Sequence, residues 1–213
     1  MWWIHSTVHY AGVTSSDLAS RPGVKSPGRP LSAELSEQLV AVAVDILADE
    51  GWGRLNSDRV AARARAGKAG IYRRWPTMAA LVRHAVGGFD LVPRPADQGS
   101  LRDDLVALLQ PWTRPLDKQE RAAASLVGAA RHDEDLRAGL QDTVVQRLTT
   151  VLAELAHRSA ERGQPVAGPR LELLGTLVQA LWWERYTAFA VPVTADEVAD
   201  LVDTLPLPVV AVV

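Results

Sequence analysis

A short basic segment in the first half of the chain holds the side chains best suited to bind a polyanion. Lys68, Arg73 and Arg74 carry cationic groups that can reach phosphates. The hydroxyl of Tyr72 can donate a hydrogen bond to another phosphate oxygen. These residue types predict a surface that contacts nucleic acid, although a solvated basic face on a small helical bundle would have the same composition.

The spacing of the segment fits one short helix with two different sides. Ile71 and Trp75 lie four residues apart and supply an apolar side that packs inward. The small residues Ala69 and Gly70 would let the helix backbone come close to base edges in a major groove. Arg29 stands ahead of the first helix, in a Gly-Arg-Pro sequence, and is placed to enter a neighbouring minor groove.

The elements that must position this helix follow from the periodicity of apolar residues. An amphipathic stripe over residues 35–47 predicts a helix that Gly51 ends. A short helix over 57–64 follows, and after three further residues a second short helix covers 68–75. Pro76 closes that helix, because the residue before a proline avoids the helical region. A long helix followed by two short ones across a tight turn predicts a helix-turn-helix unit.

The remainder of the chain is also predicted to be helical. The expected N-caps are Asn56, Thr77 and Thr194. The expected helices after the first three cover residues 77–86, 100–109, 118–130, 134–162, 170–190 and 194–203. The final apolar stretch, residues 206–213, is too short to build a sheet alone. The predicted fold class is therefore all-α.

Charge divides the chain into a basic and an acidic part. Residues 1–86 hold 11 Lys and Arg against 7 Asp and Glu, a net charge of +4. Residues 87–213 hold 12 against 18, a net charge of −6. This asymmetry fits a polyanion-binding module joined to a body that does not bind polyanions.

The composition excludes several kinds of site. The absence of cysteine excludes disulfides, thiolate metal centres and a thiol nucleophile. No HExxH, GxSxG or glycine-rich phosphate loop is present, so no enzyme, catalytic residue, cofactor or metal is predicted. His5 and His9 have a spacing that can hold a metal on a helix, but without a carboxylate or third histidine nearby they form an incidental pair.

Membrane insertion and secretion are not expected either. No stretch approaches about 18 consecutive apolar residues, the length that a membrane span requires. The first ten residues lack the basic start and long apolar core of a secretory signal. We therefore expect a cytoplasmic protein.

Four separated segments resemble one known protein family in their order and spacing. They are Gly28–Pro30, Ala43–Trp52, Leu55–Ala64 and Lys68–Pro76. Over roughly residues 28–86, the chain resembles the DNA-binding domain of the tetracycline-repressor (TetR) family. Residues 100–203 resemble the ligand-binding and dimerisation part of that family only in their helix pattern.

The resemblance implies a one-component bacterial transcription regulator, usually a repressor. Such a protein binds a palindromic DNA operator as a homodimer and releases it when a small molecule binds. The resemblance further implies that Lys68, Tyr72 and Arg73 contact DNA. It also implies that Ser57 touches a phosphate, while Ile71 and Trp75 hold the recognition helix in place.

Three parts are expected from the motifs and the resemblance together. Residues 1–27 form an amino-terminal extension, and residues 28–86 form the helix-turn-helix DNA-binding domain. Residues 87–213 form a helical effector-binding and dimerisation domain.

The turn of the helix-turn-helix unit departs from the family pattern. Members commonly have Gly-Val-Ser where this chain has Arg65, Ala66 and Gly67. A positive φ at Arg65 would cost roughly 1 kcal/mol, and Gly67 can cap a helix without a side-chain hydrogen bond. Gly70 replaces a usual threonine and loses its hydroxyl. A second interpretation therefore stays open, a helical ligand-binding dimer that has lost sequence-specific DNA binding.

The carboxy-terminal part suggests a dimer and a ligand pocket. The helix expected over 170–190 is apolar on more than one side, so we expect a homodimer interface through residues 170–203. Trp112, Trp182 and Tyr186 are candidates for an aromatic pocket that binds the effector. The alternative is that these three residues are ordinary core, because aromatic residues at helical spacing usually pack.

Overall fold

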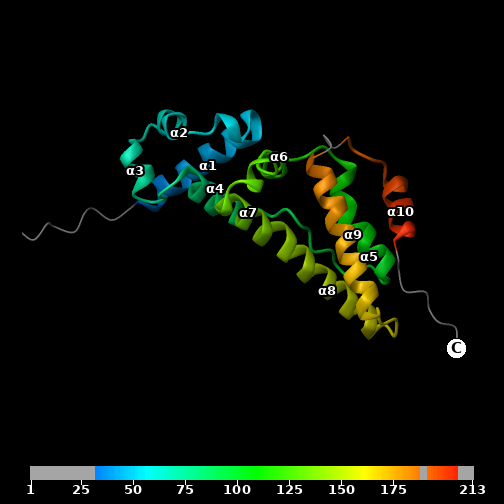
Figure 1. Cartoon of the computed structure of the whole chain (residues 1–213). Helices are drawn as coiled ribbons and strands as arrows, with labels where there is room; N and C mark the ends of the chain where they lie inside the picture. Colours follow the sequence, from blue (N-terminus) through cyan, green and yellow to red (C-terminus); the bar gives the residue numbers. More distant parts are fainter. Residues whose placement is uncertain (1–31, 188–190, 206–213) are drawn as a thin grey trace, which may run out of the picture. The chain divides into compact units, whose positions relative to one another are not determined.

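The computed structural model describes residues 32–187 and 191–205. The expectations for residues 1–27 with their two histidines, for Arg29 and for residues 206–213 lie outside this part of the chain. Within the described ranges every regular element is helical, which confirms the predicted all-α fold (Figure 1). In the same ranges, no helix is both long enough and apolar enough to cross a membrane.

The elements follow one another in a simple order along the chain. The helices are α1 (Ala33–Glu50), α2 (Ser57–Arg63), α3 (Lys68–Tyr72), α4 (Met78–Gly87), α5 (Leu101–Leu109), α6 (Lys118–Ala124), α7 (Glu134–Leu140), α8 (Gln146–Glu161), α9 (Gly168–Thr187) and α10 (Ala195–Thr204). Short 3-10 turns are η1 (Trp52–Arg54), η2 (Gln110–Thr113) and η3 (Ala129–Arg131), and η4 (Gln141–Val145) is a π turn.

The first helix begins and ends where its sequence dictates. The Ser32 hydroxyl accepts a hydrogen bond from the Leu35 N–H at 3.3 Å and caps α1. At the other end Gly51 adopts a φ of 81°, which glycine tolerates, and its N–H bonds the Ile46 and Leu47 carbonyls at 3.1 and 3.2 Å. The helix thereby buries one apolar side against its neighbours.

The three predicted N-caps are confirmed. The side chains of Asn56, Thr77 and Thr194 each accept a hydrogen bond from the backbone N–H three residues later, at 2.9, 2.9 and 3.2 Å. Thr194 also forms a capping box, because the Glu197 carboxylate accepts the Thr194 N–H at 2.7 Å. These caps fix where α2, α4 and α10 begin.

Three predicted helices are shorter than the sequence indicated, or interrupted. The helix expected over 68–75 ends at Tyr72. The helix expected over 118–130 ends at Ala124, and turns lead from it into η3. The helix expected over 134–162 is interrupted by the π turn η4, in which the buried Thr143 hydroxyl donates to the Val86 carbonyl of α4 at 3.2 Å. A π turn inserts one residue without changing the polarity of the surface, so hydrophobic spacing does not show it.

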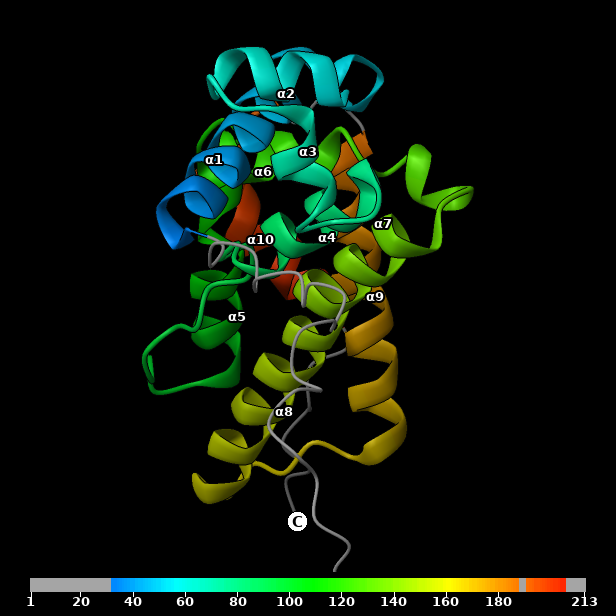
Figure 2. The ribbon, with the colours of Figure 1, turned by 90° about the vertical axis from the view of Figure 1, so that its left-hand side faces the viewer.

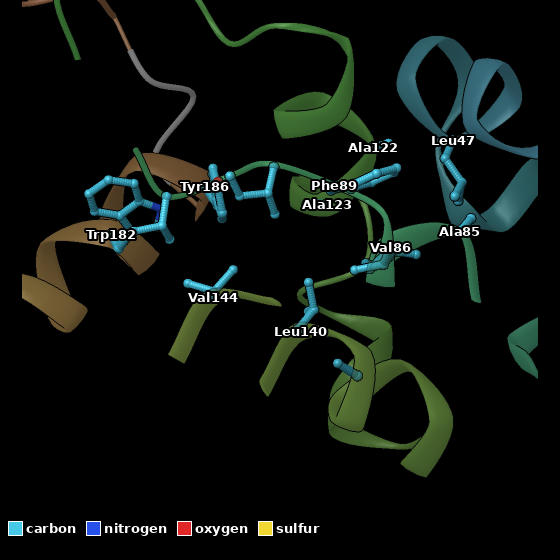
Figure 3. Packing of buried hydrophobic residues seen from close by; sticks show 14 of the residues in the cluster. Leu47, Ala85, Val86, Phe89, Ala122, Ala123, Leu140, Val144, Trp182 and Tyr186 are labelled. Atoms are coloured by element: carbon cyan, nitrogen blue, oxygen red, sulfur yellow. The ribbon is translucent and has the colours of Figure 1, made fainter. Parts of the chain in front are cut away.

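The core is continuous from α1 to α9. Figure 2 shows α1, α2 and α3 close to one another, and α8 running beside α9. Between these groups, α4 packs on both α1 and α7, and Gly139 of α7 lets the backbone of α4 approach. A Cβ at Gly139 would stand 3.5 Å from the Arg83 Cα. Figure 3 shows the buried side chains along this path, from Leu47 to Trp182.

Candidate nucleic-acid interface

The inward side of α3 is held by the two residues that the sequence assigns to it. Ile71 is fully buried and Trp75, just beyond the helix, is 8% exposed. The Trp75 ring lies 5.5 Å from the ring of His84, which belongs to α4. These contacts set the orientation of α3 on the helices beneath it.

The outward side of α3 is cationic and exposed. Lys68, Ala69, Tyr72 and Arg73 are all exposed, and Tyr72 shows 49% of its surface to solvent. A large aromatic side chain on the outside of a small helical unit has no packing role there, and its hydroxyl can donate to a phosphate. The structure thus brings four of the predicted contact residues onto one accessible side.

An ion pair engages one of these cations. The Lys68 Nζ lies 2.5 Å from Asp58 Oδ1 of α2, and both side chains are largely exposed. The hydrogen bond to the Asp58 carboxylate raises the pKa of the Lys68 ammonium. A DNA phosphate at this position would have to replace Asp58 as the partner of the ammonium.

Two predicted contact residues lie differently from the expectation, Gly70 and Arg74. Gly70 is buried, and a Cβ there would stand 3.8 Å from Arg74 Nη1 and 3.9 Å from Leu35 Cδ2. The Arg74 guanidinium is partly buried and donates to Ser36 Oγ at 2.8 Å, the Gly70 carbonyl at 2.8 Å and the Ser32 carbonyl at 3.1 Å. Positions 70 and 74 are one helical turn apart, so both fall on the side of α3 that meets the start of α1.

In the turn between α2 and α3, the residue that stands where the family commonly has glycine adopts a positive φ. Arg65 has a φ of 49°, in the left-handed region that favours glycine. Gly67 caps α3 with a φ of −82° and makes no side-chain hydrogen bond. Ser57 is the first residue of α2 and is half-buried, at the helix end where backbone N–H groups attract anions.

A carboxylate fastens α2 to the end of α1. Glu50 accepts hydrogen bonds from the guanidinium groups of Arg59 and Arg63, both on α2. Desolvation opposes ionisation of this carboxyl, but the two guanidinium groups outweigh it and lower the Glu50 pKa below its ordinary value of 4.5. The position of α2, and through the turn that of α3, is therefore tied to the last turn of α1.

The three aromatic candidates for a ligand pocket all bury their polar atoms. The Trp112 and Trp182 indole nitrogens and the Tyr186 hydroxyl are buried, and within the described part of the chain none has a hydrogen-bond partner outside the Trp182–Tyr186 pair itself. Trp182 and Tyr186 lie four residues apart on α9 and side by side in Figure 3. Burial raises the pKa of the Tyr186 hydroxyl well above its ordinary value, so this group stays protonated and can donate.

A buried ion pair next to this cluster was not found from the sequence. Arg185 of α9 and Glu120 of α6 are each 2% exposed at the side chain and approach to 3.2 Å. Glu120 also accepts from Arg114 Nη1 at 2.6 Å and closes a capping box with Asp117. The Asp-x-x-Glu spacing at 117–120 could have identified Glu120 as part of a capping box, but no sequence signal links it to Arg185, 65 residues later.

Comparison with protein families finds matches in both halves of the chain. Residues 39–85 match the family described as bacterial regulatory proteins, tetR family. Residues 95–205 match the family described as tetracyclin repressor-like, C-terminal domain. The first match covers the helix-turn-helix residues described above, and the second covers more than half of the chain.

Whole proteins and solved structures agree with this assignment. An uncharacterised HTH-type transcriptional regulator of Mycobacterium tuberculosis is 31% identical over 194 residues, which cover 91% of this chain and 94% of the relative. A DNA-binding transcriptional repressor TetR of Mycobacteroides abscessus is 29% identical over 155 residues, 71% of this chain and 82% of that protein.

Among solved structures, Salmonella enterica GusR superposes with a TM-score of 0.65 at 15% identity, over 81% of this chain and 95% of that chain. A TetR family transcription regulator superposes with a TM-score of 0.55 at 27% identity, over 81% of this chain and 96% of the other. The helix-turn-helix geometry, the family matches and the similarity over most of the chain lead to one conclusion: the protein belongs to the TetR family of bacterial transcriptional regulators, a class of DNA-binding proteins and not of enzymes.

Proposed function

We propose that the protein is a repressor that binds a palindromic operator as a homodimer and releases it when a small-molecule effector binds. The observation that carries this proposal is the two-sided α3, with Ile71 buried beneath it and Lys68, Tyr72 and Arg73 exposed on the outside. The name of the Mycobacteroides abscessus relative, a DNA-binding transcriptional repressor, supports repression as the mode of action.

The proposed DNA contacts follow from the exposed side of the helix-turn-helix unit. Lys68, Tyr72 and Arg73 reach phosphates or base edges, and Ala69 allows α3 to approach the major groove closely. Ser57 contacts a phosphate at the start of α2. Arg29, outside the described residues, serves as an arm into the minor groove. Gly70 and Arg74 position α3 instead of touching DNA.

The proposed domain organisation assigns DNA binding to residues 28–86 and effector binding with dimerisation to residues 87–213, after an extension over 1–27.

We propose that the homodimer forms through residues 170–203. Leu173 of α9 is 49% exposed, and a groove between α9 and α10 is lined by the partly buried Leu177, Leu181 and Leu201, beside Glu184 and Thr204. In a symmetric pair of chains these leucines would be buried against the twin.

The effector is proposed to bind near Trp112, Trp182 and Tyr186. Two indole N–H groups and one protonated hydroxyl are buried with no partner in the described residues outside the Trp182–Tyr186 pair, so they are donors that ligand oxygens can satisfy. Leaving such groups unpaired costs about 1–3 kcal/mol each, so a ligand that accepts from them gains affinity.

As a DNA-binding protein, the regulator is proposed to act in the cytoplasm.

The test is selection of bound sequences from a random duplex library at moderate salt with non-specific competitor DNA. We expect enrichment of a palindrome whose half-sites are spaced by about one helical turn, 10–10.5 base pairs, or a multiple of it. The variant Lys68→Ala with Arg73→Ala, which leaves Ile71 and Trp75 in place, should enrich nothing while remaining folded and dimeric.

A second function is favoured by the strained turn at Arg65 and by the absence of a side-chain cap at Gly67. If the wild-type protein is folded and dimeric but enriches no sequence, with or without prior removal of bound small molecules by denaturation and refolding, a ligand-binding dimer without operator recognition replaces the repressor.

A further inference from the structure

A groove of about 800 Å³ lies where the end of α1 meets α6 and the end of α9. We propose that this groove binds a small amphipathic organic anion, such as an aromatic sulfonate or carboxylate, and that the bound anion alters the affinity of the helix-turn-helix unit for DNA. The second half of the proposal rests on the proposed function. The groove shares Tyr186 with the aromatic cluster but opens between different helices.

The inner part of the groove is apolar. Its wall includes Leu47 of α1, which is 1% exposed, and the partly buried Leu116 and Val127. Tyr186 of α9, 6% exposed, adds an aromatic ring, and its protonated hydroxyl has no partner among the described residues other than Trp182. An aromatic or acyl body placed here would bury apolar surface on both itself and the protein.

The rim of the groove carries an exposed cation, Arg131, which favours a negatively charged ligand. Arg131 and His132 are exposed on the rim, and neither pairs with a carboxylate anywhere in residues 32–187 and 191–205. The one acid among the lining residues, Asp49, already lies 3.5 Å from Arg121. The two arginines and one aspartate that line the groove leave it a net charge of +1. The acids that follow His132 in the sequence are engaged in part elsewhere, since Glu134 pairs with Arg137 and Asp135 with Arg83.

The groove is also connected to the DNA-binding helices. Asp49 and Gly51 line it, and the residue between them is Glu50, which holds α2 through Arg59 and Arg63. On the opposite wall, Arg121 of α6 donates to the carbonyls of Ala48 at 3.4 Å and Leu116 at 3.2 Å. A ligand that fills the groove would press between the last turn of α1 and α6, and the Glu50 contacts would carry any displacement to α2.

Two fluorescent probes with the same aromatic body test the binding half of the proposal. Anilinonaphthalene sulfonate carries one negative charge, and phenylnaphthylamine carries none. We expect the sulfonate to bind at one saturable site per chain and more tightly than the neutral probe. Arg131→Glu should weaken the sulfonate about fivefold or more and leave the neutral probe nearly unchanged, because only the charge at the rim has been altered.

Two further variants make the result specific to the groove. Arg170→Glu makes the same change of charge at the other end of α9, sixteen residues and about 24 Å from Tyr186, and should leave both probes unaffected. Gly128→Phe fills the groove, since a Cβ at Gly128 meets nothing within 4 Å, and should abolish binding of both probes. Thermal unfolding verifies that each variant is folded. Equal weakening by the two charge reversals, or full binding to the filled groove, would overturn the site.

A selected operator duplex tests the regulatory half. Saturating sulfonate should change the Kd for the operator at least threefold in the wild type and leave it unchanged in Gly128→Phe. An unchanged Kd despite binding of the probe overturns the coupling but keeps the site. A protein that binds no operator at all overturns the proposed function and the coupling together, while the probe titrations still decide whether the groove is a binding site.

Discussion

Helices α1–α4 and helices α5–α10 differ in how deeply they bury ion pairs. In the first region the ion pairs lie at the surface, as with Lys68 and Asp58, whose side chains are 52% and 74% exposed. The second region has exposed pairs too, such as Arg102 with Asp203, but it also buries charges: Glu120 and Arg185 are each 2% exposed, and Asp104 is fully buried against Arg162 at 3.0 Å. Both regions are helical and packed on one core, so the difference lies in what the charges do.

Exposed and buried ion pairs suit two different roles, exchange of partners and fixing of structure. An exposed ion pair contributes little to stability and is easily exchanged, so the cations of α3 can leave carboxylates for DNA phosphates. A buried pair costs several kcal/mol of desolvation per ion, and removing one partner leaves the other without compensation. The buried pair between α6 and α9 therefore fixes the position of α6, the helix that packs on α1 through Arg121.

The largest expected effect comes from breaking the buried pair. Arg185→Met keeps an unbranched apolar stem and removes the guanidinium group, leaving Glu120 buried with Arg114 as its remaining cation. We expect the free energy of unfolding to fall by about 3 kcal/mol. Urea-induced unfolding at one fixed protein concentration measures it.

The matched control is Arg102→Met, which breaks an exposed pair with Asp203 whose nitrogen–oxygen distance is 2.6 Å. Its effect should be far smaller, because the freed Asp203 carboxylate is solvated. Both pairs lie in the second region, so the comparison isolates the effect of burial. If both variants lost the same stability, burial would not be what gives the Glu120–Arg185 pair its structural role.

The next effect concerns the exposed cations and rests on the proposed function. Lys68→Ala should weaken binding to all DNA sequences about equally and reduce the dependence of log Kd on log salt by about 1. Asp58→Asn should act in the opposite direction and strengthen binding, since it frees the Lys68 ammonium that Asp58 now holds. Fluorescence anisotropy at several salt concentrations measures both slopes, and an unchanged slope in Lys68→Ala would exclude a phosphate contact.

The first region was largely predictable because its determinants are local. The caps Asn56 and Thr77, the buried pair Ile71 and Trp75, and the strained position Arg65 all depend on residues a few places apart. The inward position of Arg74 was not predicted, because it depends on Ser36 of α1, 38 residues away. Spacing within one helix cannot show which neighbouring helix will cover a given side.

The second region was predictable in fold class but not in its polar interior. Glu120 and Arg185 are 65 residues apart, and Arg162 and Asp104 are 58 apart, so neither pair leaves a local pattern. The aromatic candidates were identified by type, yet their unpaired nitrogens and hydroxyl emerge only from the packing. Long-range polar contacts are therefore what the sequence pattern missed.

A smaller effect tests the turn of the helix-turn-helix unit. Arg65 holds a φ of 49°, so Arg65→Gly should relieve backbone strain and raise the free energy of unfolding by about 1 kcal/mol. Arg65→Asn should give part of this gain, because asparagine tolerates the left-handed region better than arginine does. Thermal unfolding measures both variants. A loss of stability in Arg65→Gly would show that the arginine side chain contributes more than its backbone costs.

The smallest expected effect concerns Glu50, and it has a distinct pH dependence. The ion pairs of Glu50 with Arg59 and Arg63 hold α2 on α1, so these charges of the first region also have a structural role. Arg59 and Arg63 lower its pKa in the folded protein below the ordinary 4.5, so the ionised form contributes stability above pH 4.5. That contribution is lost as the pH falls through the lowered value. Glu50→Gln should therefore have a lower Tm than the wild type at pH 6, and the two should converge in the acid range below pH 4.5. A Tm difference that stays constant down to pH 3 would mean that Glu50 holds α2 by shape and hydrogen bonding, with its charge playing no part. The contrast between the two regions would then rest on the buried pairs alone.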